Sequence, residues 1–256
     1  MPRILCLPGF LQSGSLLAEK SSGLRKLLTK KLNYDLVYLD PPVIISTKDQ
    51  LPFKLSVDPQ EENERWADIV AKDVNRCWWL KSSSNDYVGF EDAMKYIVKH
   101  LEENGPYDGI IGFSQGAAMS AIVANSIEKL VPKNGPLGIA VLFSPFAFTV
   151  PKNTNEEMAQ LNSEITDLKE YTSRVDLNPL YKTYFEPQSS PSTKMVAVYG
   201  TEDAVVPPVR TEYLCSLYPE IEIVKHDGGH YMPNKKSFLN PIVELFKGSL
   251  EGKPEL

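Results

Sequence analysis

A glycine-flanked serine between two apolar segments most constrains how this chain folds. Residues 112–116 read Gly-Phe-Ser-Gln-Gly. Segment 109–113 is typical of a buried strand, and segment 117–124 of a helix built from small residues. Strand, sharp turn and helix together predict a nucleophile elbow, which lifts the hydroxyl of Ser114 above a sheet, near the positive N-terminus of the helix. The simpler alternative is a tight turn whose serine only caps the helix.

Short apolar segments alternate with longer amphipathic ones along the chain. We expect strands at 4–7, 36–39, 109–113, 137–143, 195–199 and 222–224, and helices at 15–32, 90–101, 117–124, 207–217 and 237–246. This order predicts a single α/β domain over residues 1–256, with a mostly parallel sheet of about six strands covered by helices on both faces.

Two long segments, 41–87 and 144–194, interrupt this alternation. Both leave the carboxyl end of a predicted strand, which is the edge where parallel sheets bind ligands. We therefore expect them to be lid-like insertions that cover a pocket, with partial disorder of their most polar parts as the alternative.

Composition and charge argue against several function classes. The 256 residues carry a formal net charge of −6 and no basic stripe, so we do not expect nucleic-acid binding. No segment approaches the roughly 20 apolar residues that span a bilayer. The cysteines Cys6, Cys77 and Cys215 are widely spaced, which argues against a disulfide scaffold and a zinc site. We expect a cytoplasmic protein without a secretion signal, a metal or an organic cofactor.

A serine alcohol needs a base to take its proton, and one histidine is well placed for this role. His230 lies in a glycine-containing loop after the last predicted strand, so it is our candidate base, with His226 as the alternative. The acid that orients the imidazole should follow the preceding strand. Asp203 is our candidate there, ahead of Glu202 and Asp227, although aspartates after strands often only form turns.

The oxyanion of an acyl-transfer reaction needs two backbone amides. One should belong to Gln115, which follows the nucleophile, and the other to the loop 8–14 after the first strand. Phe10 is the better candidate because Gly9 before it lets the backbone approach a substrate closely, and Leu11 is the alternative. Aromatic residues of the insertions are candidates for an apolar acyl pocket, against the simpler role of core packing: Trp78, Trp79, Phe146 and Phe148.

Four segments of the chain resemble the FSH family of serine hydrolases, which occurs in fungi and has animal relatives. They are 8–14, 19–26, 104–117 and 228–234, in the family's order. The resemblance implies an α/β-hydrolase fold and a triad of Ser114, Asp203 and His230. The elbow is also similar to those of carboxylesterases and acyl-protein thioesterases.

One position departs from that family. The first loop usually contains His-Gly, whereas this chain has Pro8-Gly9. The family's histidine shapes the loop rather than acting in the triad, so we expect catalysis to survive. Proline fixes φ and lacks an N–H, which bears on the donor geometry of the loop.

These residues predict a serine hydrolase that cleaves a small-molecule acyl ester or thioester through an acyl-enzyme. The alternative is a non-catalytic receptor for small molecules or a partner-binding scaffold on the same fold, since fold does not determine function. A peptidase or a carbon–carbon bond hydrolase on this scaffold is a third interpretation.

Overall fold

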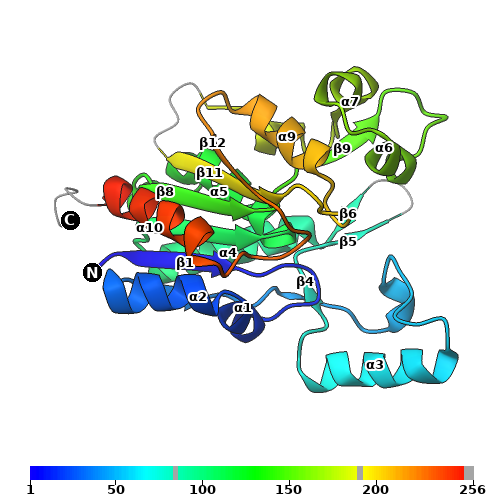
Figure 1. Cartoon of the computed structure of the whole chain (residues 1–256), viewed down its shortest axis with the longest axis horizontal. Coiled ribbons are helices and arrows are strands. Elements are labelled where there is room, and N and C mark those ends of the chain that lie inside the picture. Colours follow the sequence, from blue (N-terminus) through cyan, green and yellow to red (C-terminus); the bar gives the residue numbers. More distant parts are fainter. Residues whose placement is uncertain (83–85, 189–192, 251–256) are drawn as a thin grey trace.

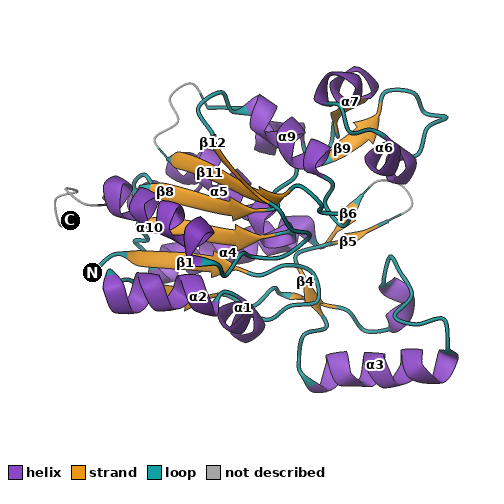
Figure 2. Ribbon diagram, viewed as in Figure 1, coloured by secondary structure: helices purple, strands orange, loops and turns teal. Residues whose placement is uncertain are grey.

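The structure, a computed structural model, describes residues 1–82, 86–188 and 193–250, and one sheet forms its centre (Figures 1 and 2). The six strands lie in the order β12-β11-β8-β7-β1-β2, and every neighbouring pair is parallel. They are β1 (Arg3–Leu7), β2 (Asp35–Tyr38), β7 (Gly109–Phe113), β8 (Ile139–Phe143), β11 (Lys194–Gly200) and β12 (Glu222–His226). This arrangement confirms the predicted fold class.

The strand order reverses direction between β1 and β7. From β1 the chain first adds β2 on one side, and all later strands of the sheet extend the other side. The carboxyl ends of two strands at such a switch point diverge and leave a crevice, where ligands bind in open α/β sheets. The loop after β1 and the serine turn after β7 both border this crevice.

Helices cover both faces of the sheet, as the alternation of apolar side chains requires (Figure 2). Along β1, Leu5 and Leu7 face one core, and Ile4 and Cys6 face the other. The first core includes α4 (Phe90–Asn104), α5 (Gln115–Leu130) and α9 (Pro208–Leu217). The second includes α1 (Gly14–Lys20), α2 (Ser22–Lys26) and α10 (Lys236–Leu250).

The prediction of one continuous helix over residues 15–32 is wrong, because the structure interrupts it. Segment 15–32 forms α1, then α2, then a π-helical turn at Leu27–Lys31. The break falls at Ser21, whose hydroxyl donates to the Leu17 carbonyl. A serine hydroxyl that donates to a carbonyl of the preceding helical turn competes with regular helix geometry. The leucine spacing of the sequence carries no sign of this interruption.

Both insertions extend beyond the carboxyl-end edge of the sheet (Figure 1). The first holds β3 (Val43–Ile44), a 3-10 turn (Lys48–Gln50), α3 (Pro59–Ala71), β4 (Arg76–Cys77), β5 (Leu80–Lys81) and the start of β6 (Tyr87–Val88). The second holds β9 (Thr149–Pro151), α6 (Met158–Glu164), α7 (Leu168–Arg174), β10 (Val175–Leu177) and α8 (Lys182–Phe185). Residues 83–85 and 189–192 of these insertions lie outside the described residues. The role of the insertions as pocket covers stays a prediction.

Within the described ranges, no helix has both the length and the apolar character needed to cross a membrane. The same residues contain no cluster of three or more histidine, cysteine, aspartate or glutamate side chains able to hold a metal ion. The three cysteines are buried and unbonded to one another.

Gly116 fixes the contact between α5 and the end of β1. A Cβ at this position would lie 2.1 Å from the Leu7 carbonyl oxygen and 2.4 Å from that of Pro8. Both obstacles are backbone atoms, so Gly116→Ala must push the helix away from the strand. We expect it to lower the free energy of unfolding by about 3 kcal/mol, measured by urea titration.

Gly248→Ala is the matched control for that substitution. Gly248 is exposed in α10, and an added Cβ would meet nothing within 4 Å. Because alanine favours helix over glycine, we expect this variant to be more stable by up to about 1 kcal/mol. Equal stabilities of the two variants contradict the assigned packing.

Candidate active site

Ser114 occupies a strained turn between β7 and α5. Its backbone angles are φ 53° and ψ −118°, a region that non-glycine residues rarely adopt. A hydrogen bond from the Ser114 amide to the Phe143 carbonyl, at 2.9 Å, stabilises the turn. A Cβ on Gly112 would lie 2.3 Å from the Gly116 carbonyl oxygen, so the turn is too tight for a side chain there. Such strain persists only where the surroundings enforce it, and it is typical of functional positions.

Asp203 and His230 meet at the same edge of the sheet. The Nδ1 atom of His230 lies 2.8 Å from Oδ2 of Asp203. Oδ2 also accepts a hydrogen bond from the Ser144 hydroxyl at 2.9 Å, and Oδ1 accepts from the amides of Val205 and Val206 at 3.0 and 2.8 Å. Four donors therefore surround a carboxylate that is only 2% exposed.

These contacts keep Asp203 ionised. Burial by itself raises the pKa of a carboxyl, but the hydrogen bond and charge of His230, the Val206 amide and the Ser144 hydroxyl outweigh it and hold the pKa of Asp203 below its usual range. A carboxylate accepts hydrogen bonds and donates none, so His230 carries its proton on Nδ1. Its Nε2 is then available as a base.

The alternative base, His226, and the alternative acids, Glu202 and Asp227, differ in their surroundings from His230 and Asp203. His226 is 3% exposed, and its Nδ1 accepts from the Gly228 amide at 3.3 Å while its ring packs against Tyr231 and Phe238. Burial lowers the pKa of His226, which favours its neutral form. Glu202 and Asp227 are exposed.

Ser114 and His230 lie on neighbouring loops. Phe113, the residue before Ser114, packs against the imidazole of His230 with ring centroids 4.8 Å apart. Among the residues that the structure describes, no hydrogen bond joins the Ser114 hydroxyl to His230. Catalytic hydrogen bonds are often long in the absence of substrate, so this geometry is compatible with a base role.

The loop after β1 touches the serine turn. A Cβ on Gly9 would lie 3.2 Å from the Ser114 Cβ, so glycine permits this close approach. The Leu11 amide, our alternative oxyanion donor, is already bonded to the Arg76 carbonyl at 2.9 Å. Within the described ranges, the amides of Phe10 and Gln115 donate to no protein acceptor. Of the donors considered from the sequence, these two are free to bind a ligand.

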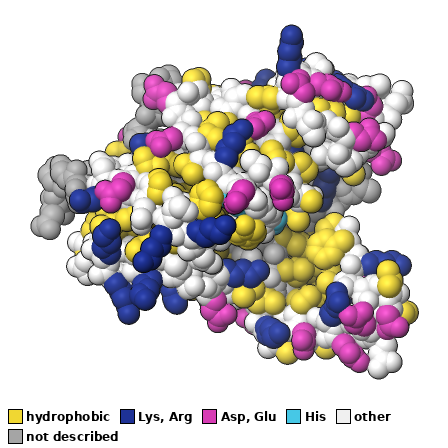
Figure 3. Space-filling model, viewed as in Figure 1, with side chains coloured by type: hydrophobic (Ala, Val, Ile, Leu, Met, Phe, Trp, Pro, Cys, Tyr) yellow, Lys and Arg dark blue, Asp and Glu magenta, His cyan; other side chains and the backbone are white. Residues whose placement is uncertain are grey.

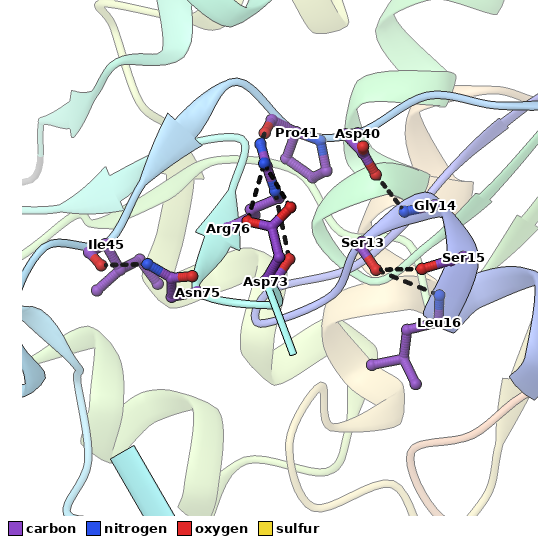
Figure 4. Close-up of polar contacts among 10 residues, drawn as sticks. All are labelled: Ser13, Gly14, Ser15, Leu16, Asp40, Pro41, Ile45, Asp73, Asn75 and Arg76. Atoms are coloured by element: carbon purple, nitrogen blue, oxygen red, sulfur yellow. Dashed lines mark hydrogen bonds and ion pairs between the residues drawn. The ribbon is translucent and has the colours of Figure 1, made fainter. Parts of the chain in front are cut away.

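The side chain of Arg76, whose carbonyl holds Leu11, has polar partners of its own (Figure 4). The Arg76 guanidinium bonds both carboxylate oxygens of Asp73, at 2.9 and 2.7 Å, and donates to the Pro41 carbonyl at 3.3 Å. In the same region, Asp40 accepts from the Gly14 amide at 2.6 Å. Arg76 of the first insertion thus holds the loop after β1 through the Leu11 amide, a contact that the sequence did not indicate.

The side chain of Gln115 also has a role that sequence reasoning missed. Its carbonyl oxygen accepts from the Trp78 amide and its amide nitrogen donates to the Trp79 carbonyl, both at 3.0 Å. The Trp78 indole in turn donates to the Pro8 carbonyl at 2.7 Å. A side chain with one donor and one acceptor is required to bridge two successive peptide groups, and glutamine supplies both.

Ser114 opens into a cavity of about 730 Å³. Phe10, Gln115, Trp79 and Phe146 share its lining. Figure 3 shows the corresponding surface hollowed beside the α3 segment, with hydrophobic side chains along it. The structure does not bring the other two aromatic candidates there. Trp78 and Phe148 are fully buried, and Phe148 stacks on Tyr87 with ring centroids 4.0 Å apart.

Comparison with known proteins decides the family. A family model described as "Serine hydrolase (FSH1)" matches residues 1–242. The chain belongs to this serine hydrolase family. The predicted family and enzyme class are thereby confirmed, and the protein is a hydrolase rather than a receptor that merely shares the fold.

Individual relatives agree with the family. "Family of serine hydrolases 3" of Saccharomyces cerevisiae is 29% identical, over 98% of this chain and 86% of that protein. "Esterase OVCA2" of Danio rerio is 25% identical, over 96% of each chain. Among solved structures, that of esterase PE8 superposes with a TM-score of 0.55 and 16% identity, over 97% of this chain and 93% of the other. At that identity the last match shows the α/β-hydrolase fold alone.

Proposed function

We propose that the FSH1-family chain hydrolyses the ester or thioester of a small acyl substrate through a triad of Ser114, His230 and Asp203. The observation that carries the proposal is the 2.8 Å contact between His230 and Asp203, at the sheet edge that also bears the strained turn of Ser114. Relatives named as esterases, such as that of Danio rerio, support the ester substrate class.

Each group has a defined step in this mechanism. The Ser114 hydroxyl attacks the substrate carbonyl while His230 Nε2 takes its proton, and Asp203 stabilises the imidazolium that forms. The amides of Phe10 and Gln115 hold the oxyanion. His230 then protonates the leaving alcohol or thiol, and water attacks the acyl-enzyme by the same route to release the acid. Trp79 and Phe146 provide apolar surface for the acyl chain.

A fluorophosphonate probe tests the identity of the nucleophile. Such probes react with a serine only where a base activates it, so we expect one label per chain, located on Ser114 by tandem mass spectrometry. Heat-denatured protein is the control and should remain unlabelled. A label on another serine, or no label on the folded protein, contradicts the proposal.

A panel of acyl esters and acyl thioesters of graded chain length then separates the two substrate classes. Both should be cleaved with burst kinetics if acyl-enzyme formation precedes a slower hydrolysis. The ratio of their kcat/KM values assigns the preference.

A further inference from the structure

A cation without a counter-charge lines the cavity that holds Ser114. Arg210 belongs to α9 and contributes to the cavity lining. Its guanidinium carbon lies 4.2 Å from the centre of the Phe146 ring. The side chain is half-buried and hydrogen-bonds with Tyr171, while its Nε atom is buried without a partner. No carboxylate of the described ranges forms an ion pair with the guanidinium. Taking part of a guanidinium out of water without pairing its charge costs free energy.

A second cation lies in the same lining. Lys81 of β5 borders the cavity with Arg210, and part of its side chain is exposed. Loss of surrounding water, followed by the nearby charge of Arg210, lowers the pKa of Lys81. Asp49 is the carboxylate of the described cavity lining, and it is exposed to solvent, which weakens its field at the guanidinium.

This local positive charge does not follow from the composition of the chain. The protein has a formal net charge of −6, so the positive charge at this cavity is opposite in sign to the net charge of the chain. Stacking on Phe146 uses one face of the guanidinium, and Tyr171 takes part of its hydrogen-bonding capacity. A guanidinium has five N–H donors in a planar arrangement, so its terminal nitrogens still offer donors that fit the oxygens of a carboxylate.

We propose that the substrate carries a free carboxylate, which Arg210 binds with Lys81 beside it while Ser114 cleaves the ester bond at the other end. The substrate class is a monoester or monothioester of a dicarboxylic acid. This inference rests on the proposed function, because it concerns the same cavity. The reaction remains a hydrolysis: water adds to the acyl group, the C–O or C–S bond breaks, and the leaving group takes a proton.

Two esters of matched length test the proposal. One is the p-nitrophenyl monoester of adipic acid with a free far carboxylate, and the other carries a methyl ester at that end. After subtraction of the enzyme-free rate, we expect kcat/KM of wild type to favour the free acid about 10- to 100-fold. Raising the salt concentration from 0.05 to 0.5 M should shrink this preference. Equal rates, or a preference for the methyl ester, overturn the proposal.

Arg210→Gln should reduce that preference at least tenfold, mainly through KM of the free acid. The ratio of the two substrates within one variant cancels any general loss of activity. Lys133→Gln is the control, since Lys133 is exposed near the opposite end of α5 from Ser114, and it should leave the ratio unchanged. An unchanged ratio in a folded Arg210→Gln protein overturns the assignment. If that variant does not fold, two other measurements test the assignment. They are the substrate preference of Lys81→Gln and the salt dependence of the wild-type preference.

A binding measurement separates this inference from the proposed function. Calorimetry with Ser114→Ala compares adipate monomethyl ester with adipate dimethyl ester and needs no turnover. Tighter binding of the monomethyl ester supports the carboxylate site even if Ser114 proves not to be the nucleophile. Equal binding of the two, together with hydrolysis of neutral esters by wild type, overturns the carboxylate site and leaves the esterase proposal intact.

Discussion

Ser114→Ala is expected to lower kcat for ester hydrolysis by a factor of about 10⁴ or more, because it removes the group that forms the acyl-enzyme. Two other described serines near the turn are not available to take its place. The Ser144 hydroxyl donates to Asp203 at 2.9 Å, and Ser120, which lies six residues after Ser114 in α5, is fully buried. The loss should appear in kcat, since the cavity and its binding contacts remain.

The measurement is steady-state hydrolysis of a p-nitrophenyl ester, with fluorophosphonate labelling as a second readout. Ser120→Ala is the matched control, because it removes a hydroxyl from the same helix without altering the cavity lining. It should keep wild-type rates and labelling. Retention of more than a tenth of the activity by Ser114→Ala contradicts the assignment of the nucleophile.

The sheet and the placing of the three triad candidates were predictable because parallel strands bring their carboxyl ends to one edge. Ser114, Asp203 and His230 follow β7, β11 and β12, and each comes after an apolar segment of the sequence. The contact of Asp203 with His230 required only that the loops after two neighbouring strands face each other. Local sequence could therefore indicate which residues would lie together.

Contacts between segments that share no sequence pattern were not predictable. Ser144 follows β8 and donates to Asp203, but a serine after a strand has no distinguishing signal. The sequence leaves the Leu11 amide open as an oxyanion donor, whereas in the structure this amide donates to the Arg76 carbonyl of the first insertion. Arg210 lies on a short helix, and only the folded chain shows that its charge enters the cavity.

Asp203→Asn is expected to lower kcat by a factor of about 10⁴ while the protein remains folded. Oδ1 of Asp203 accepts from two backbone amides, those of Val205 and Val206, and backbone amides can only donate. The single oxygen of asparagine must therefore take the Oδ1 position. Its NH₂ group then replaces Oδ2 and faces Nδ1 of His230. An NH₂ donor there forces the imidazole to accept at Nδ1 and to carry its proton on Nε2.

An imidazole with its proton on Nε2 cannot take the proton of Ser114, so the loss follows from the wrong tautomer and not from a lost charge alone. Ser144→Ala is the matched control, because it removes one of the hydrogen bonds to Asp203 and leaves the carboxylate facing His230. We expect it to lower kcat less than tenfold. The kcat values of the two variants test whether Asp203 sets the tautomer of His230. Thermal unfolding checks that both variants are folded. If Asp203→Asn stays within tenfold of wild type, Asp203 does not set the tautomer of the base, and the triad must be reassigned.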